Sequence, residues 1–187
     1  CMSEENKEQR IAKFFTKLDW ALDISAKQLN ERYDFQKTAL KKQFPLLMSG
    51  LWLGSEKLSP NDTIESILNQ GTLSIGFIGL AEALIALIGK HHGESAEAQE
   101  LGLRIVSHMS ERVNGFAETF QHNFTMLATP AEGLAGRFTK MDKKKFGIIK
   151  GVTDKDYYTN SSHIPVYFRC TPQHKAEIEE RFEEKGF

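Results

Sequence analysis

The feature that most limits the fold of this 187-residue chain is its first quarter, because residues 5–42 contain neither glycine nor proline. Apolar residues recur there at helical spacing, at Ile11, Phe15, Leu18, Leu22 and Leu29. The pattern predicts one amphipathic helix, roughly 55 Å long at about 1.5 Å per residue. The helix should end before the Phe44-Pro45 pair, because a residue that precedes proline avoids the helical region.

Charge and cysteine content exclude several classes of protein. The 24 Lys and Arg residues balance 25 Asp and Glu residues, so no basic field favours nucleic acid or an anionic membrane as a partner. Cys1 and Cys170 cannot form a disulfide framework, which indicates the reducing cytoplasm. The longest apolar run, residues 75–88, contains Glu82 and is too short to span a bilayer. Cys1 precedes the first methionine. It is either an added residue or the start of a segment cut from a longer protein, and a lipid-modified mature N-terminus is a third alternative.

Further along the chain, helical and extended patterns follow each other. We expect a loop over residues 46–59, a short helix over 63–69 capped by Asn61 or Asp62, and a strand after Gly71 that leads into a helix ending at Gly89. A second long amphipathic helix is predicted over residues 97–122. Strands are predicted over 123–128 and 164–169, an exposed basic turn over 142–147, and a charged tail from Thr171.

The tetrad Thr129, Pro130, Ala131 and Glu132 has the composition of a capping box, with Thr at the N-cap, Pro at the first helical position and Glu at the third. The simplest interpretation is a helix start. The alternative is an anion pocket at the helix N-terminus, where Gly133 would let a phosphate approach. The carboxylate of Glu132 opposes a phosphate unless it turns back onto the cap.

Two further polar clusters and one histidine each allow a structural and a functional interpretation. Asn160, Ser161, Ser162 and His163 either position a polar substrate or satisfy the backbone of their own loop. Residues 90–95 contain two adjacent histidines, but neighbouring side chains diverge and no third ligand is near, so a solvated turn is favoured over a metal site. His108 lies beside the apolar stripe of its helix and is interpreted as a satisfied interfacial histidine.

Four blocks of the sequence, at residues 71–82, 89–95, 123–134 and 156–166, resemble in order and spacing the anaerobic, oxygen-sensitive class III ribonucleoside-triphosphate reductases. The resemblance covers about residues 62–168. It implies α/β architecture, specifically a partial segment of the family's ten-stranded α/β barrel. On this basis we divide the chain into a long helix and loop (1–61), a barrel segment with substrate-side loops (62–170) and the charged tail (171–187).

The resemblance also implies a chemistry. Such enzymes reduce ribonucleoside triphosphates to deoxyribonucleotides: a radical stored on a glycine passes to a cysteine, which abstracts the ribose 3′-hydrogen, usually with formate as reductant. A structural zinc and an activating enzyme that uses an iron–sulfur cluster and S-adenosylmethionine are implied for the parent protein. This chain has no recognisable radical-glycine loop, Cys-x-x-Cys pair or ATP-cone. We therefore expect an inactive fragment without catalytic residue, metal or cofactor of its own.

The residues expected to bind substrate follow from two of the matching blocks. The block at residues 123–134 is aligned with a segment proposed to hold substrate phosphates, and it contributes Thr129, Ala131, Glu132, Gly133 and Leu134. The block at residues 156–166 contributes Asn160, Ser161 and His163. Ser162 stands where the family commonly has Phe. This interpretation requires the two polar turns to face each other.

The expected partners are a ribonucleoside triphosphate, the remainder of the reductase, the activating enzyme and a second copy in a homodimer. The alternative is a non-catalytic helical interaction module related to the reductase.

Overall fold

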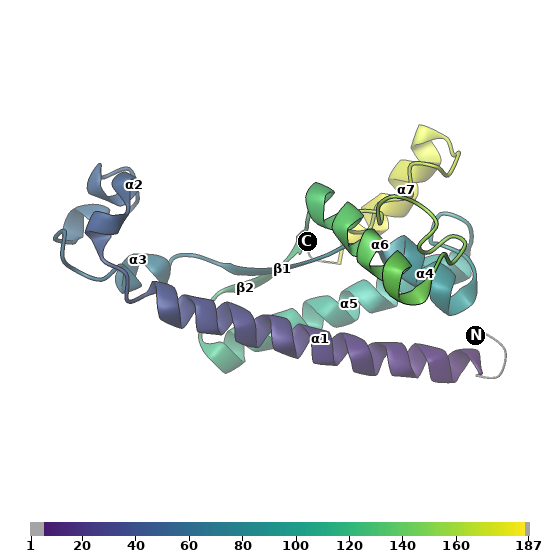
Figure 1. Cartoon of the computed structure of the whole chain (residues 1–187), viewed down its shortest axis with the longest axis horizontal. Helices are drawn as coiled ribbons and strands as arrows, with labels where there is room; N and C mark the ends of the chain where they lie inside the picture. Colours follow the sequence, from purple (N-terminus) through teal and green to yellow (C-terminus); the bar gives the residue numbers. More distant parts are fainter. Residues whose placement is uncertain (1–5, 186–187) are drawn as a thin grey trace. The chain divides into compact units, whose positions relative to one another are not determined.

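The computed structural model describes residues 6–185, so Cys1 lies outside the described part of the chain. The protein is helix-rich α/β with a few short strands (Figure 1). In chain order the elements are α1 (Lys7–Gln36), η1 (Lys41–Gln43), α2 (Pro45–Met48), η2 (Ser55–Lys57), α3 (Glu65–Leu68), β1 (Leu73–Phe77), α4 (Leu80–Ile88), α5 (Ala96–Phe120), β2 (Phe124–Ala128), α6 (Glu132–Phe146) and α7 (Pro172–Glu183). Among the described residues, no helix is both long enough and apolar enough to cross a membrane.

The chain divides into two compact units that are discontinuous in sequence. Unit 1 takes the described residues of Cys1–Asp19, Gly76–Arg112 and Met126–Phe187, and unit 2 takes Trp20–Ile75 and Val113–Thr125. Both long helices and both strands contribute residues to each unit. The division into residues 1–61, 62–170 and 171–187 stays a prediction.

Strands β1 and β2 pair in a two-stranded sheet, and α4 and α5 form the connection between them. Leu73 N donates to Asn123 O, while further along both strands Gly76 lies against Thr129, so the strands run parallel. The strand-to-helix turn depends on Gly79, whose φ of 80° is a left-handed conformation that favours glycine. The predicted strand, helix and closing Gly89 are thereby confirmed.

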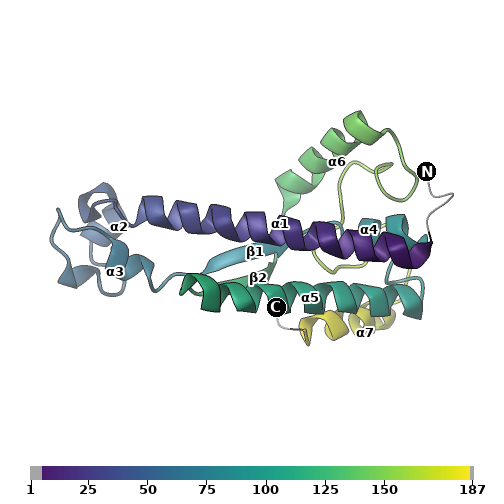
Figure 2. The same ribbon diagram turned by 90° about the horizontal axis from the view of Figure 1, so that it is seen from below.

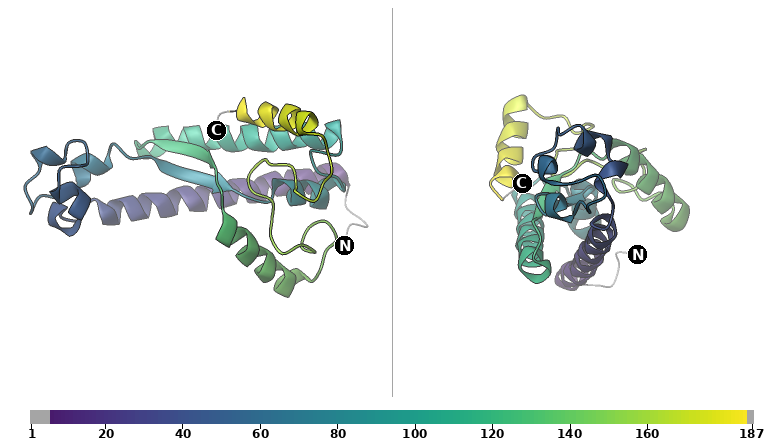
Figure 3. Two further views of the ribbon diagram at one scale, coloured as in Figure 1. Left: turned by 90° about the horizontal axis from the view of Figure 1, so that it is seen from above. Right: turned by 90° about the vertical axis from the view of Figure 1, so that its left-hand side faces the viewer.

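The core of unit 1 is formed by α4, the first part of α5, and α7, which runs beside α5 (Figures 2 and 3). Leu84, Val106 and Phe182 are completely buried. A side chain at Gly102 of α5 would meet the Phe182 ring at 3.1 Å and Leu84 at 3.3 Å, so the absence of a side chain there lets the elements approach closely. The predicted charged tail is therefore a helix with a buried apolar face.

Unit 2 has two apolar clusters. In one, the rings of Phe116, Phe120 and Phe124 pack with centroids 5.7 to 6.2 Å apart. In the other, Leu47, Ile64 and Ile67 are buried and are covered by Ala39 and Leu58. Lys41 is also buried there, and its ammonium donates to Ser55 O at 2.8 Å and Leu58 O at 2.7 Å. These carbonyls replace the water that a buried cation loses.

Several sequence-based boundaries were wrong for identifiable reasons. Helix α1 ends at Gln36 rather than near Phe44, because the following chain pairs with residues 60–64 through Lys41 N to Asp62 O and Ile64 N to Ala39 O. Asp62 does not cap α3, because its carboxylate accepts Ser59 N at 2.7 Å. The loop predicted over 46–59 contains α2 and η2.

Two further predictions, both in unit 1, also differ from the structure. The basic turn expected over residues 142–147 is the last part of helix α6, where Lys143, Lys144 and Lys145 carry the charge that stabilises a helix C-terminus. The strand expected over residues 164–169 is an irregular segment. Its buried residues, Ile164 and Pro165, pack into the unit without a neighbouring strand, and Ile164 N donates to the Glu179 carboxylate instead.

Candidate functional site

The junction between β2 and α6 does not contain the predicted capping box. Helix α6 begins at Glu132, its N-cap is Ala131, and no side chain caps it. Thr129 Oγ1 donates instead to Leu127 O at 3.3 Å, and the Thr129 side chain lies against Gly76 of β1. The assignment of Thr129 as N-cap was wrong because this threonine belongs to the end of the sheet. Glu132 is consequently the first residue of the helix, not the third.

The second polar turn, residues 160–163, and the preceding Thr159 are held to the core by several contacts. Glu82 of α4 is buried, and its Oε1 accepts Thr159 N at 3.0 Å and Thr159 Oγ1 at 2.7 Å. Asn160 forms an isolated antiparallel bridge with Ile78. Ser162 O lies 2.9 Å from His92 Nε2. The turn itself is tight, and Ser161 has a φ of 38°. The contacts with the surrounding unit hold the turn in this conformation.

A cavity of about 510 Å³ is lined by parts of both turns. Of the predicted residues, Glu132, Asn160 and His163 line it, and Thr129, Ala131, Gly133, Leu134 and Ser161 do not. Ser161 and Ala131 are buried, whereas Gly133 and Leu134 are exposed. The other lining residues come from α6, from the segment after it and from α7: Ala135, Gly136, Asp156, Tyr157, Tyr158, Thr159, Ile164, Val166, Tyr167 and Lys175.

The cavity wall combines aromatic rings with a buried polar atom that has no hydrogen-bond partner. Tyr158 donates its hydroxyl proton to Asp142 Oδ2 at 2.8 Å, and burial followed by this hydrogen bond raises the pKa of Tyr158. Burial, with smaller contributions from Glu82 and other acids, raises the pKa of Tyr167 to about 12. Asn160 Oδ1 is buried without a hydrogen-bond partner. Such a wall suits a ligand with a flat ring and polar substituents.

Glu82 behind this wall is an unusual buried carboxyl group. Its Oε2 has no hydrogen-bond partner, and burial raises the pKa of Glu82 despite the opposing hydrogen bonds from Thr159. Burial disfavours the charged form because the surrounding apolar groups cannot replace water. No sequence pattern indicates this buried carboxyl group, since Glu82 is only an interruption in an apolar run.

The two adjacent histidines are not in a solvated turn, and that interpretation was wrong. His91 is 2% exposed and His92 is 1% exposed. The His91 ring packs edge-on against Phe168, and the His92 ring packs against Phe182. Burial lowers the pKa of His92 to about 4. His108, by contrast, lies 2.7 Å from Asp19 Oδ1, in agreement with the predicted satisfied histidine.

The described residues do not fit a metal site. Within residues 6–185, no three His, Cys, Asp or Glu side chains are grouped closely enough to hold an ion, so these residues do not form the structural zinc site that the resemblance implies. Cys170 is a free thiol.

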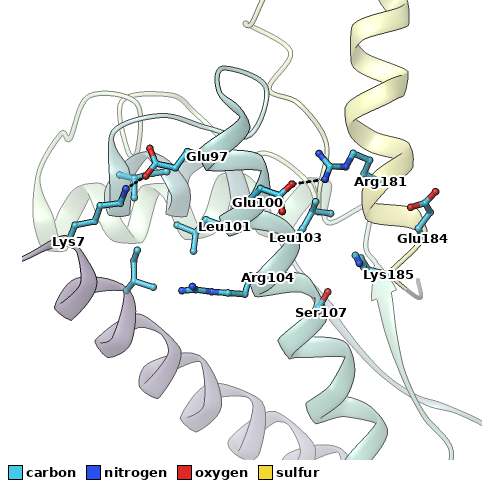
Figure 4. A pocket seen from close by; sticks show the side chains of 12 residues that line it. Lys7, Glu97, Glu100, Leu101, Leu103, Arg104, Ser107, Arg181, Glu184 and Lys185 are labelled. Carbon is cyan, nitrogen blue, oxygen red and sulfur yellow. Dashed lines mark hydrogen bonds and ion pairs between the residues drawn. The ribbon is translucent and has the colours of Figure 1, made fainter.

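A larger cavity, of about 700 Å³, lies among α1, α5 and α7 (Figure 4). Its charged side chains mostly neutralise one another: Lys7 pairs with Glu97, and Arg181 pairs with Glu100 at 2.6 Å. Arg104 projects between the helices and lies over the Phe15 ring at 5.0 Å. Neither predicted turn contributes to this cavity, so the smaller cavity is the better candidate site.

Comparison with known proteins decides the family. The sequence profile described as anaerobic ribonucleoside-triphosphate reductase matches residues 3–186, nearly the whole chain. The chain belongs to the anaerobic ribonucleoside-triphosphate reductase family. Within this family it is 35% identical over 170 residues to the reductase of Haemophilus influenzae and 32% identical over 172 residues to that of Escherichia coli. The reductase of Enterobacteria phage T4 is 35% identical over 125 residues, which are 66% of this chain.

These relatives are much longer than the chain. The matches cover 89% and 90% of this chain but only 24% of the Haemophilus and Escherichia reductases, and the phage match covers 19% of that protein. This agrees with the interpretation of the chain as an internal segment of a reductase. The similarity extends over the long N-terminal helix and α7, beyond the range of about 62–168 that the motifs had indicated.

Proposed function

We propose that this chain is part of the catalytic domain of an anaerobic ribonucleoside-triphosphate reductase, and that the cavity beside α6 forms one wall of its ribonucleotide site. The observation that supports the proposal is that residues of both polar turns line one cavity. Glu132 comes from the first turn, and Asn160 and His163 come from the second. The parallel β1-α4-α5-β2 arrangement is the kind of unit from which an α/β barrel is built.

Within this proposal the chain binds and orients substrate. The first-turn amides of α6 belong to Glu132, which lines the cavity, and to Gly133 and Leu134, which follow it and are exposed; they precede Ala135, whose N–H makes the first intrahelical bond to Ala131 O. Such amides have no acceptor within the helix and favour phosphate oxygens. The amide of Asn160 and the ring of His163 supply polar contacts to the sugar, and the tyrosine rings supply a stacking surface.

The radical chemistry belongs to the rest of the proposed reductase. A glycyl radical, a radical-carrying cysteine, formate, a structural zinc and an iron–sulfur activating enzyme are proposed for the whole protein, acting in the cytoplasm on ribonucleoside triphosphates. The isolated chain, incubated with the activating enzyme and formate, should form no deoxyribonucleotide. Measurable turnover would contradict the assignment of the chain as a substrate-binding segment.

Nucleotide binding tests the proposed site directly. Isothermal titration of the isolated chain with ribonucleoside triphosphates should detect binding, and a Thr129→Ala, Gly133→Pro double variant should lose it, because proline removes the Gly133 N–H that would donate to a phosphate oxygen. Gly115→Ala is a suitable control, since a Cβ there meets nothing within 4 Å. Equal affinity of the double variant and the control would contradict the proposed site at the α6 N-terminus.

A further inference from the structure

Helix α7, predicted as a charged tail, is firmly anchored to the core of unit 1. Phe182 is 0% exposed and packs against the His92 ring, and Ile178 is also buried. Arg181 donates to Gln99 Oε1 at 2.7 Å and to Glu100 Oε1 at 2.6 Å. The hydroxyl of Thr171 accepts His174 N and so caps the helix. A helix fixed in this way holds the side chains of its other face in defined positions.

Those side chains reach the candidate site. Glu179 is one turn from Lys175, and the two are 3.8 Å apart. The Oε1 atom of Glu179 accepts Ile164 N at 2.9 Å and lies 3.3 Å from His163 Nδ1. His163 and Lys175 both line the cavity, whereas Glu179 stands behind them with 18% of its side chain exposed. One carboxylate therefore contacts atoms of three residues that line the cavity, His163, Ile164 and Lys175.

The contact with His163 has a definite chemical consequence. A neutral imidazole carries its proton on one nitrogen only, and the partner of the other nitrogen decides which. A carboxylate oxygen can only accept a hydrogen bond, so Glu179 stabilises the form with the proton on Nδ1. In this tautomer the Nε2 atom keeps its lone pair and can accept a hydrogen bond. In the other tautomer, with the proton on Nε2, this atom would be a donor.

We propose that Glu179 is a positioning residue of the cavity, which holds His163 with its proton on Nδ1 so that Nε2 accepts a hydrogen bond from a hydroxyl group of the ligand. The inference rests on the proposed function, and within it the hydroxyl belongs to the ribose of a ribonucleotide. Lys175, beside Glu179, places a positive charge at the same cavity, which also contains the carboxylates of Glu132 and Asp156.

The tautomer of the imidazole is measured by nitrogen-15 NMR of the histidine side chains in alkaline solution. The His163 signals are assigned by their loss in a His163→Gln variant. The wild-type chain should show mainly the form protonated on Nδ1. In Glu179→Ala the ratio of the two forms should shift at least about fivefold toward protonation on Nε2, because the acceptor is gone.

Glu180→Ala is the matched control, because Glu180 is the next residue of the same helix and its side chain is exposed. It should leave the His163 signals unchanged. Alanine is compatible with the helix at both positions. If Glu179→Ala does not fold, the wild-type spectrum still decides: a wild-type His163 protonated mainly on Nε2 would overturn the proposal. An unchanged ratio in folded Glu179→Ala would overturn it as well.

A ribonucleoside triphosphate titration separates this proposal from the proposed function. Glu179→Ala should bind the triphosphate about tenfold more weakly than Glu180→Ala, which corresponds to about 1.4 kcal/mol. If wild type binds no nucleotide but His163 is protonated on Nδ1, the proposed function fails and the positioning role stands. If wild type binds nucleotide and Glu179→Ala changes neither the nucleotide affinity nor the ratio of the two His163 tautomers, the positioning role alone fails.

Discussion

At the scale of single residues, Gly76 shows how one missing side chain determines the sheet. A Cβ at this position would collide with Thr129 Oγ1 and would lie 2.8 Å from Thr129 Cβ. Gly76→Ala should therefore lower the free energy of unfolding by roughly 1–3 kcal/mol, through overpacking between β1 and the end of β2. Urea denaturation followed by circular dichroism measures this change.

Gly115→Ala should change the free energy of unfolding in the opposite direction. Gly115 is inside α5 and a Cβ there meets nothing within 4 Å, so alanine should raise the free energy of unfolding by about 0.5–1 kcal/mol through its better helix propensity. A neutral Gly76→Ala would mean that Thr129 is not packed against β1.

The lowered pKa of His92 predicts how the stability of the chain depends on pH. Its pKa is lowered to about 4 by burial, below the ordinary value of 6.5. The unfolded chain therefore binds more protons than the folded chain between pH 4 and pH 6.5, and stability falls as the pH falls through this window. The full loss from this residue is on the order of 3 kcal/mol. Burial shifts the pKa of His91 in the same direction.

His92→Gln removes the titrating group and keeps a donor for Ser162 O. The loss of stability between pH 6.5 and pH 4, measured by urea denaturation at several pH values, should become smaller in this variant. The part that remains includes the contribution of His91. An identical pH profile in wild type and variant would show that His92 is not buried in its neutral form.

At the scale of elements, the two threonine-proline pairs behave differently although they look alike in sequence. Thr171 precedes Pro172 and caps α7, whereas Thr129 precedes Pro130 and caps nothing. Thr171→Ala should cost about 1 kcal/mol of stability, because the N–H of His174 loses its acceptor. Thr129→Ala should cost clearly less, since its weak hydrogen bond is to a neighbouring carbonyl.

Thermal unfolding of both variants tests this contrast. Thr171→Ser should recover most of the loss, since serine is an equally good N-cap residue. A larger loss of stability for Thr129→Ala than for Thr171→Ala would support Thr129 as an N-cap residue, as the capping-box pattern predicts.

At the scale of the whole molecule, exposed apolar side chains predict self-association. In unit 2, Leu51 is 77% exposed and Leu53 is 79% exposed, and Trp52 lies between them. Side chains of this kind promote association when no partner covers them. Light scattering of the isolated chain should therefore show dimers or larger species.

A Leu51→Ser, Leu53→Ser double variant should lower the apparent mass at the same protein concentration. Its stability should remain near that of wild type, because both side chains are already in water. A monomeric wild-type chain would contradict this prediction, and so would an unchanged mass in the variant.

The elements that depend on local pattern could be predicted from the amino-acid sequence alone. The 3.6-residue period predicted α1 and α5, β-branched and aromatic residues predicted β1 and β2, and Gly89 correctly marked the end of α4. The motif blocks also indicated the reductase family. All these signals come from residues close together in the chain, where spacing alone determines which side chains share a face.

Tertiary structure decided the roles of individual polar groups. Thr129 follows a helix-start pattern but turns to its sheet, His91 and His92 are buried rather than solvated, and α7 carries Glu179 to the cavity that His163 lines. Each outcome depends on partners distant in sequence, such as Gly76 for Thr129 and Phe182 for His92. A polar side chain has several acceptable hydrogen-bond partners, and only the packed unit determines which of them is within reach.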